Sequence, residues 1–283
     1  MTDDRRLRAA GWMLLAQALF TVMAIGARFA GSGVPWQEIA GSRFLLGALV
    51  ALGVARARGA SLRITRQKLA WTRSLLGTVA AGGTFYVLAS PDLAIGDAVT
   101  IFATAPIFIA LLSWPLLGEK VHGIVAIAIA LAFAGIVAIA RPSFHSAGRL
   151  LAAGALAAVA AALAMMWLRK LGPNETSEAI VFHFSTVGTV VMLLLSIPVW
   201  RTPGGRDVVA LLATGLSAGV AQLAMTRAYA LEHAAPISAL QYANVVFTRL
   251  VAWPLFGELP GGAQLAGSVL VLGAGVALAF RRS

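Results

Sequence analysis

The sequence contains one long internal repeat. The segment WPLLGE, from Trp114 to Glu119, recurs as WPLFGE, from Trp253 to Glu258, at an offset of 253 − 114 = 139 residues. Each copy closes one apolar run and precedes another. Similarity at one long, fixed offset indicates two copies of a single structural unit. We therefore predict a first unit at residues 1–144 and a second at residues 145–283.

Composition places this duplicated chain in a membrane. Hydrophobic residues make up 59% of the sequence and charged residues only 12%, against roughly 25% charged residues in soluble domains. The apolar runs do not alternate as β-barrel strands do, and each is near the ~20 residues that a membrane helix needs. The sequence thus predicts an all-α integral membrane protein with ten transmembrane helices, five per repeat. The expected helices are 9–30, 37–55, 71–90, 94–116, 121–140, 150–168, 179–199, 208–230, 236–256 and 262–280.

The positive charges indicate how the chain is oriented. Of the 22 Lys and Arg residues, 14 fall on one side of the membrane, counting Arg73 at the start of the helix 71–90, 4 fall on the other side, and 4 lie deeper within the expected helices (14 + 4 + 4 = 22). Cytoplasmic loops carry such an excess of Lys and Arg, so we place both termini in the cytoplasm and expect no nucleic-acid partner, despite a net charge of +11. Because five helices per repeat is an odd number, the second repeat must be inverted. Inverted repeats are typical of secondary transporters.

Signals for other activities are missing from the sequence. There is no cysteine, and neither a zinc-binding His/Glu spacing, a Gly-x-Ser-x-Gly elbow nor a phosphate-binding Gly loop is found. We therefore expect no catalytic residue, no metal site and no cofactor. A membrane-embedded, lipid-modifying enzyme remains the alternative from another class.

Prolines suggest where helices bend. Pro115 and Pro254 occupy matching positions in the two repeats, whereas Pro106 and Pro236 do not match. Interrupted helices at corresponding positions of two halves point to a binding site or a hinge. We therefore expect a hinge at the helix ends that contain the matching pair.

Polar and aromatic side chains inside the apolar runs form the candidate substrate site. They are costly in hydrocarbon unless they face a cavity or a partner, and polar-tipped rings suit a pocket for amphipathic solutes. Packing or interhelical hydrogen bonding is the alternative for each residue, and Arg43 and Arg249 have Glu38 and Asp97 as alternative partners. We expect six of them to lie several turns from their helix ends, in a cavity near the midplane: Tyr86, Phe102, Trp167, Gln241, Tyr242 and Asn244. The candidate residues are Tyr86, Thr100, Phe102, Trp167, Gln241, Tyr242, Asn244, Arg43 and Arg249.

The chain resembles the drug/metabolite transporter (DMT) superfamily, in particular its EamA-type ten-helix exporters. The resemblance rests on the two turns ending at Glu119 and Glu258, on the Gly-containing helices that follow them, and on the RFLL segment from Arg43. It covers essentially the whole chain, which looks most like bacterial amino-acid exporters. The resemblance implies export of amino acids, including aromatic ones, and related metabolites through a central cavity, by a monomer or weak homodimer surrounded by lipid in the bacterial inner membrane.

Overall fold

The computed structural model describes residues 3–30, 33–89, 92, 95–140, 148–256 and 261–279. The predicted repeat boundary at residues 144/145 lies outside these ranges. The helices are α1 (Asp3–Ala30), α2 (Trp36–Arg58), α3 (Gln67–Ala89), α4 (Ile95–Phe102), α5 (Ala105–Leu117), α6 (Gly123–Ala140), α7 (Gly148–Leu171), α8 (Ser177–Ser196), η1 (Ile197–Val199), α9 (Gly205–Leu231), α10 (Ala234–Ala239), η2 (Leu240–Tyr242), α11 (Ala243–Phe256) and α12 (Gly262–Ala279).

These elements build ten membrane-spanning segments, which confirms the predicted fold class. Eight segments contain one main helix each, and the other two are α4–α5 and α10–η2–α11. Seven segments of the described chain are long and apolar enough to cross a membrane on that basis alone. The other three segments are too short or too polar to meet that standard of length and hydropathy. Helix α3 begins with polar and basic residues, α10–α11 is interrupted, and the apolar part of α12 is short.

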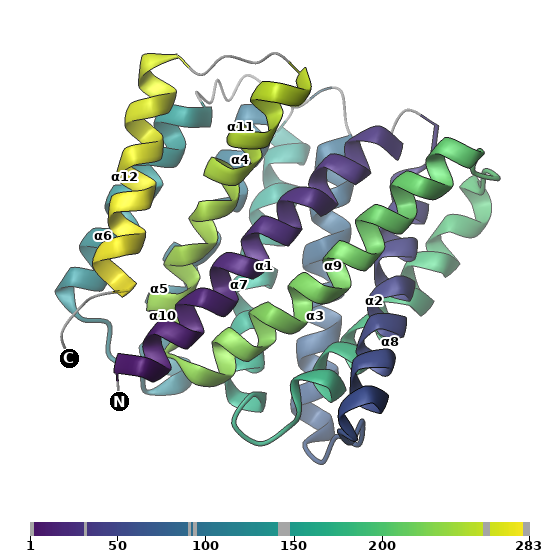
Figure 1. The fold of residues 1–283 in the computed structure, drawn as a ribbon, viewed down its shortest axis with the longest axis horizontal. Coiled ribbons are helices and arrows are strands. Elements are labelled where there is room, and N and C mark those ends of the chain that lie inside the picture. Colours follow the sequence, from purple (N-terminus) through teal and green to yellow (C-terminus); the bar gives the residue numbers. More distant parts are fainter. Residues whose placement is uncertain are drawn as a thin grey trace.

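The helices stand in two layers that are closed at both ends by a helix pair. In Figure 1, α11, α1 and α9 form the front row and α5, α7 and α3 the row behind it, while α6 and α12 stand at one end and α2 and α8 at the other. Each row combines helices from both halves of the chain. The two halves are therefore interleaved.

The contacts between helices are reproduced when each helix is replaced by its equivalent in the other repeat. Helix α1 packs on α9 just as its equivalent α7 packs on α3, and α2–α9 corresponds to α8–α3 in the same way. Two pairs, α2–α8 and α6–α12, each join a helix to its own equivalent. This pattern is expected for two repeats related by a twofold axis, because the symmetry operation must map every contact onto another contact or onto itself.

Close backbone packing holds α6 and α12 together. A Cβ atom at Gly135 would lie 2.6 Å from the Gly267 carbonyl oxygen, and one at Gly267 would lie 2.5 Å from the Gly135 carbonyl oxygen. Small residues allow membrane helices to approach this closely without polar side chains. The pair can thus complete one end of the bundle while its other faces remain apolar and exposed.

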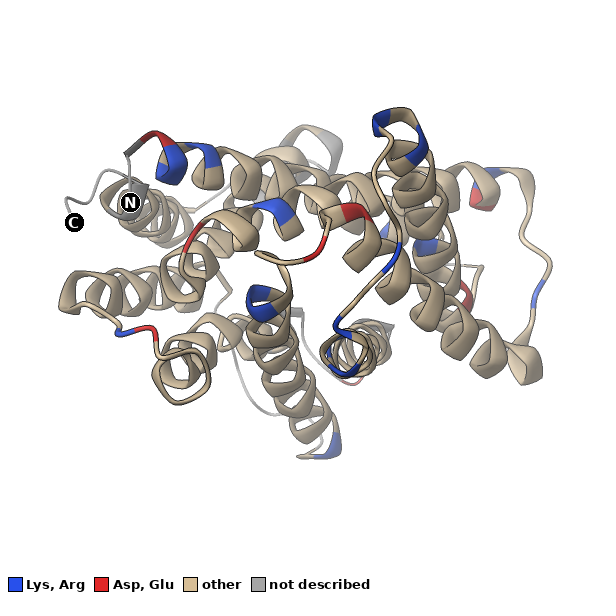
Figure 2. Cartoon of the chain, turned by 90° about the horizontal axis from the view of Figure 1, so that it is seen from below, with Lys and Arg blue, Asp and Glu red and all other residues tan. Residues whose placement is uncertain are grey.

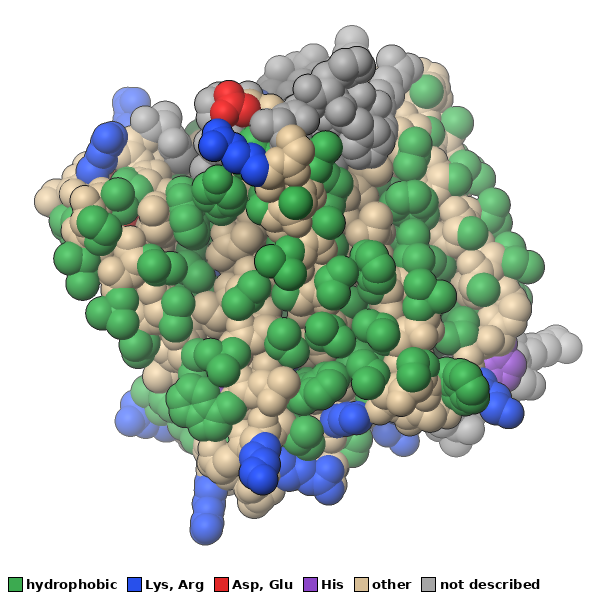
Figure 3. All heavy atoms as spheres, turned by 180° about the vertical axis from the view of Figure 1, so that it is seen from behind, with side chains coloured by type: hydrophobic (Ala, Val, Ile, Leu, Met, Phe, Trp, Pro, Cys, Tyr) green, Lys and Arg blue, Asp and Glu red, His purple; other side chains and the backbone are tan. Residues whose placement is uncertain are grey.

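The surface has the character of a membrane protein. Figure 3 shows hydrophobic side chains across the middle of one face, with charged side chains above and below them. Figure 2 shows Lys and Arg at helix ends and loops of the side that carries both chain ends. Exposed large residues such as Leu111, Ile127 and Val269 would cost free energy in water and are suited to lipid.

The largest buried cluster closes the side of the chain ends. It joins Met13 of α1, Ile109 of α5, Met166 of α7, Tyr229 of α9 and Ile237 of α10. These residues come from both layers and from both repeats. The described chain is therefore closed between its layers on this side of the membrane.

Candidate site at the two helix breaks

Two segments predicted as continuous helices are broken, and the breaks match. The first lies at Ala103 and Thr104, between α4 and α5, and the second at Leu240 to Tyr242, between α10 and α11. At the repeat offset Ala103 corresponds to Tyr242 (242 − 103 = 139). Helices α5 and α11 continue through Pro115 and Pro254. The breaks therefore do not lie at the matching proline pair, where a hinge was expected.

Proline accounts for the first break. Pro106 lies in the first turn of α5, where a missing N–H group is tolerated. The N–H of Ile107 bonds to the Thr104 carbonyl at 3.0 Å, which leaves the Ala103 carbonyl without its usual helical donor. Backbone oxygen atoms freed in this way need another partner in an apolar interior.

That partner is the equivalent residue of the other repeat. The Tyr242 hydroxyl donates to the Ala103 carbonyl oxygen at 2.8 Å, and Tyr242 is 3% exposed. A contact between equivalent positions lies on the axis that relates the repeats. The two breaks thus meet at the centre of the repeat interface, one of the places where transporters of this symmetry bind solutes.

Other polar side chains surround the second break. Gln241 donates from Nε2 to the Tyr229 hydroxyl at 2.6 Å. The Nδ2 of Asn244 donates to the Gln17 carbonyl at 3.1 Å and to the Thr21 hydroxyl at 3.2 Å. These bonds tie α10–α11 to α9 and α1. They also place amide and hydroxyl groups at the junction of the two breaks, around Ala103 and Tyr242. A solute that binds there can replace one of these hydrogen bonds with its own.

Only some of the predicted residues gather at this junction. Thr100 is buried, and Phe102 is the last residue of α4 and packs on the cluster around Val87. Tyr86 instead lies one turn from the end of α3, is 41% exposed and meets the Trp36 ring edge-on at 6.1 Å.

Trp167 also lies within a turn of a helix end, and the Lys170 ammonium is 5.1 Å from its ring centroid. The expectation that Tyr86 and Trp167 lie several turns from their helix ends was therefore wrong. The side chain of Arg249 lies outside the described part of the structure.

An ion pair joins the repeats on the side of the chain ends. Arg169 of α7 donates from Nε to Glu119 at 2.7 Å and from Nη1 to the Tyr229 carbonyl at 3.0 Å. The other Glu119 oxygen accepts from the N–H of Ala234, at the start of α10, at 2.8 Å. The repeated turn that first identified the duplication thus fixes α5 to the beginning of the broken segment.

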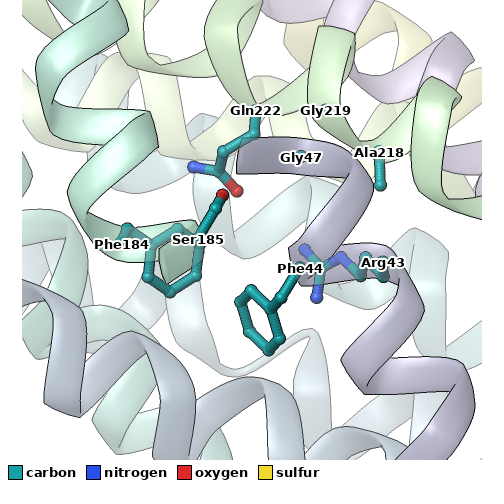
Figure 4. A pocket seen from close by; sticks show the side chains of 8 residues that line it. All are labelled: Arg43, Phe44, Gly47, Phe184, Ser185, Ala218, Gly219 and Gln222. Atoms are coloured by element: carbon teal, nitrogen blue, oxygen red, sulfur yellow. The ribbon is translucent and has the colours of Figure 1, made fainter. Parts of the chain in front are cut away.

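Arg43 lies in a separate pocket, at the end of the bundle that α2 and α8 form. Figure 4 shows it with Phe44, Phe184, Ser185 and Gln222 around a small pocket between α2, α8 and α9. Its free space is about 10 Å³, which is about enough for one water molecule. The alternative pairing with Glu38 is not formed, because Glu38 accepts from the backbone N–H of Arg201 at 2.6 Å.

Sequence reasoning missed Gln222, which lines this pocket, and Arg73, which lies against the Phe184 ring. Arg73 was counted with the basic cytoplasmic flank, yet it is 1% exposed inside α3. Gln222 of α9 was not singled out and is 5% exposed. His183 bonds through Nδ1 to the Ser74 hydroxyl at 2.8 Å. A basic residue six positions into a helix that begins at Gln67 was the available signal for Arg73.

Comparison with known proteins identifies the family. The model of the EamA-like transporter family matches residues 7–141 and again residues 148–281. The chain belongs to the EamA-like transporter family. This EamA protein is a transporter and not an enzyme, as the names of its relatives also indicate. It is a multi-pass membrane protein of the DMT type.

Relatives of this EamA protein are named for several solutes. It is 30% identical over 267 residues to the pseudopaline exporter CntI of Pseudomonas aeruginosa, covering 94% of this chain and 93% of that one. It is 27% identical to the riboflavin transporter of Vibrio cholerae over 94% and 91% of the two chains. The S-adenosylmethionine uptake transporter of Rickettsia felis is 22% identical over 94% and 90%.

A solved structure supports the same fold. A crystal structure with 22% sequence identity superposes with a TM-score of 0.80, over 96% of this chain and 97% of the other. This EamA protein therefore shares its architecture with an experimentally determined chain of similar length.

Proposed function

We propose that this EamA protein exports amino acids and related small metabolites from the cytoplasm across the bacterial inner membrane by alternating access. The observation that carries the proposal is the meeting of the two helix breaks at Ala103 and Tyr242. Breaks free backbone groups for a polar solute and let the flanking helices change direction. Closure on the side of the chain ends is one of the two states that alternating access requires.

In this proposal the solute binds between the breaks. Phe102 would contact its apolar part, while Gln241 and Asn244 would orient its polar groups by exchanging their present bonds. Thr100 and Tyr242 would complete the surroundings. Arg43 would act from its pocket between α2, α8 and α9.

Transport by the purified protein tests the proposal. Liposomes that contain only this protein should accumulate labelled L-phenylalanine, L-tryptophan or L-leucine down a concentration gradient, and the solute recovered inside should be unchanged. Protein-free liposomes are the control. Chemical conversion of the solute or of the lipid would favour the lipid-modifying enzyme, and no movement of any amino acid would overturn amino-acid export.

The direction of transport needs a separate assay, because relatives include both an exporter and an uptake transporter. Inside-out vesicles from expressing cells should accumulate the solute faster than right-side-out vesicles do. A larger metabolite is the second candidate, favoured by the relatives named for pseudopaline and riboflavin. Riboflavin therefore belongs in the same panel.

A further inference from the structure

Tyr229, near the end of α9, is hydrogen-bonded through both its backbone and its side chain. The last four carbonyl groups of a helix lack a donor within that helix, and α9 ends at Leu231. Arg169 of α7 supplies a donor from outside, because its Nη1 lies 3.0 Å from the Tyr229 carbonyl oxygen and 3.3 Å from that of Ala230. The Tyr229 hydroxyl accepts from the Nε2 of Gln241 at 2.6 Å. One residue is thus bonded to two different parts of the bundle.

These two bonds lead to opposite ends of the short helix α10, which lies beside α5 in Figure 1. Gln241 belongs to η2, directly after α10. At the other end, Arg169 donates to Glu119, and the second Glu119 oxygen accepts from the N–H of Ala234, the first residue of α10. A negative charge is favourable at that end of a helix. The bonds therefore form a closed circuit with α10. The residues of this α10 clamp are Tyr229, Gln241, Arg169, Glu119 and Ala234.

The packing around Tyr229 couples its aromatic ring to its backbone. Tyr229 is 0% exposed and belongs to the buried cluster that closes the side of the chain ends, together with Ile237 of α10. Gly172, just after α7, lets α9 approach closely, since a Cβ atom there would lie 2.9 Å from the Ala230 Cα. Closely packed interiors transmit a displacement from one group to the next. A movement of the hydroxyl is therefore passed to the carbonyl group and to Arg169.

We propose that Tyr229 is a positioning residue that couples occupancy of the solute site to opening on the side of the chain ends. The inference rests on the proposed function, in which Gln241 exchanges its present bond for one to the solute. A ligand shifts a conformational equilibrium only by binding one state better than the other. Here the closed state needs the bond between Gln241 and Tyr229, which a solute at the breaks replaces. Binding therefore favours the open state.

Cysteine labelling without any solute tests the α10 clamp. The reference protein is the purified full chain with Ser238→Cys. Ser238 is 0% exposed and its hydroxyl bonds within α10, to the Ala235 carbonyl, so the cysteine leaves the clamp intact and reacts with a maleimide only when α10 moves. Tyr229→Phe and Gln241→Met remove the same bond from its two sides. Each should raise the labelling rate several-fold, and an unchanged rate in both would overturn the proposal.

Combining changes at the two ends of α10 shows whether these ends are linked through Tyr229. Glu119→Gln weakens the end that begins at Ala234. In a linked clamp either change releases both ends, so Tyr229→Phe combined with Glu119→Gln should label within about twofold of the faster single variant. Two independent restraints would instead multiply the two single effects, and that result would overturn the proposal.

Two controls separate the α10 clamp from a general loss of packing. Thr226 lies one turn before Tyr229, is 0% exposed and bonds within α9, to the Gln222 carbonyl, so Thr226→Val should label at the reference rate. Ser196, at the end of α8, is also 0% exposed. The labelling rate of Ser196→Cys should not change when Tyr229→Phe is added. Equal acceleration at Ser196→Cys and Ser238→Cys would assign Tyr229 a packing role alone and would contradict the proposal.

L-phenylalanine, one solute of the liposome panel, tests the link to the solute site. It should raise the labelling rate of the reference protein several-fold and leave that of Tyr229→Phe at its elevated value, because this variant has already lost the bond for which the solute competes. If L-phenylalanine crosses the liposomes yet accelerates both proteins equally, the coupling through Tyr229 is wrong. The comparison without solute needs no transport, so failure of the α10 clamp and failure of amino-acid export are distinguishable.

Discussion

A single hydroxyl group connects the two helix breaks. Replacing Tyr242 by Phe removes its bond to the Ala103 carbonyl and leaves that oxygen buried without a partner. The loss should cost on the order of 1–3 kcal/mol, lower Tm and reduce transport several-fold. Differential scanning fluorimetry and the liposome assay measure the two effects.

The matched control for this change is Tyr86→Phe. It removes the same atom from an exposed side chain whose recorded contact is through its ring, so its Tm should equal that of the wild type. Equal stability of the two variants would show that the bond between the breaks contributes nothing.

Single residues of the candidate site were predictable only in part. Polarity within an apolar run of the second repeat singled out Gln241, Tyr242 and Asn244, and the structure places all three at one break. Polarity in an apolar run could not separate them from Tyr86, because exposure depends on which neighbours cover a helix face. Arg73 was missed because a basic residue near a helix end usually reaches the water at the interface.

At the scale of elements, the Glu119–Arg169 pair restrains the broken segment. Glu119→Gln removes the charge of a largely buried acceptor at the start of α10, which weakens closure on the side of the chain ends. A cysteine placed at Ser238, which is 0% exposed, should then react several-fold faster with a maleimide in the purified protein.

Asp4→Asn is the control for that experiment. It breaks an exposed ion pair with Arg8, and exposed pairs contribute little. The Ser238→Cys labelling rate should remain at its starting value in this background. Labelling that is equally slow in the Glu119→Gln background would show that the ion pair does not hold the closed state.

The breaks themselves show why sequence patterns locate helices better than their interruptions. Pro106 gave a signal at the first break, since proline removes a donor and favours the first turn of a new helix. The second break has no proline: Pro236 lies in α10, and Leu240 to Tyr242 are ordinary helix-compatible residues. Its position depends on tertiary contacts, such as the bonds of Gln241 and Tyr242.

At the scale of the whole molecule, the proposed orientation can be tested with single cysteines in this cysteine-free chain. Ser61 follows α2 and Thr202 precedes α9, and both are exposed. With the termini in the cytoplasm, a membrane-impermeant maleimide applied to whole cells should label Thr202→Cys and not Ser61→Cys. Both should react in permeabilised cells. The reverse pattern in intact cells would invert the topology.

The contact between Ala103 and Tyr242 has a consequence for any solute that is not symmetric from end to end. Because these residues are repeat equivalents, an exactly symmetric backbone around them would present the same surroundings to an amino acid whichever way its ammonium and carboxylate point. Only positions that have diverged, such as Phe102 and its counterpart Gln241, can favour one orientation. The direction in which a bound molecule points is therefore set by the mutations that made the halves unequal, and the ancestral duplication left it undetermined.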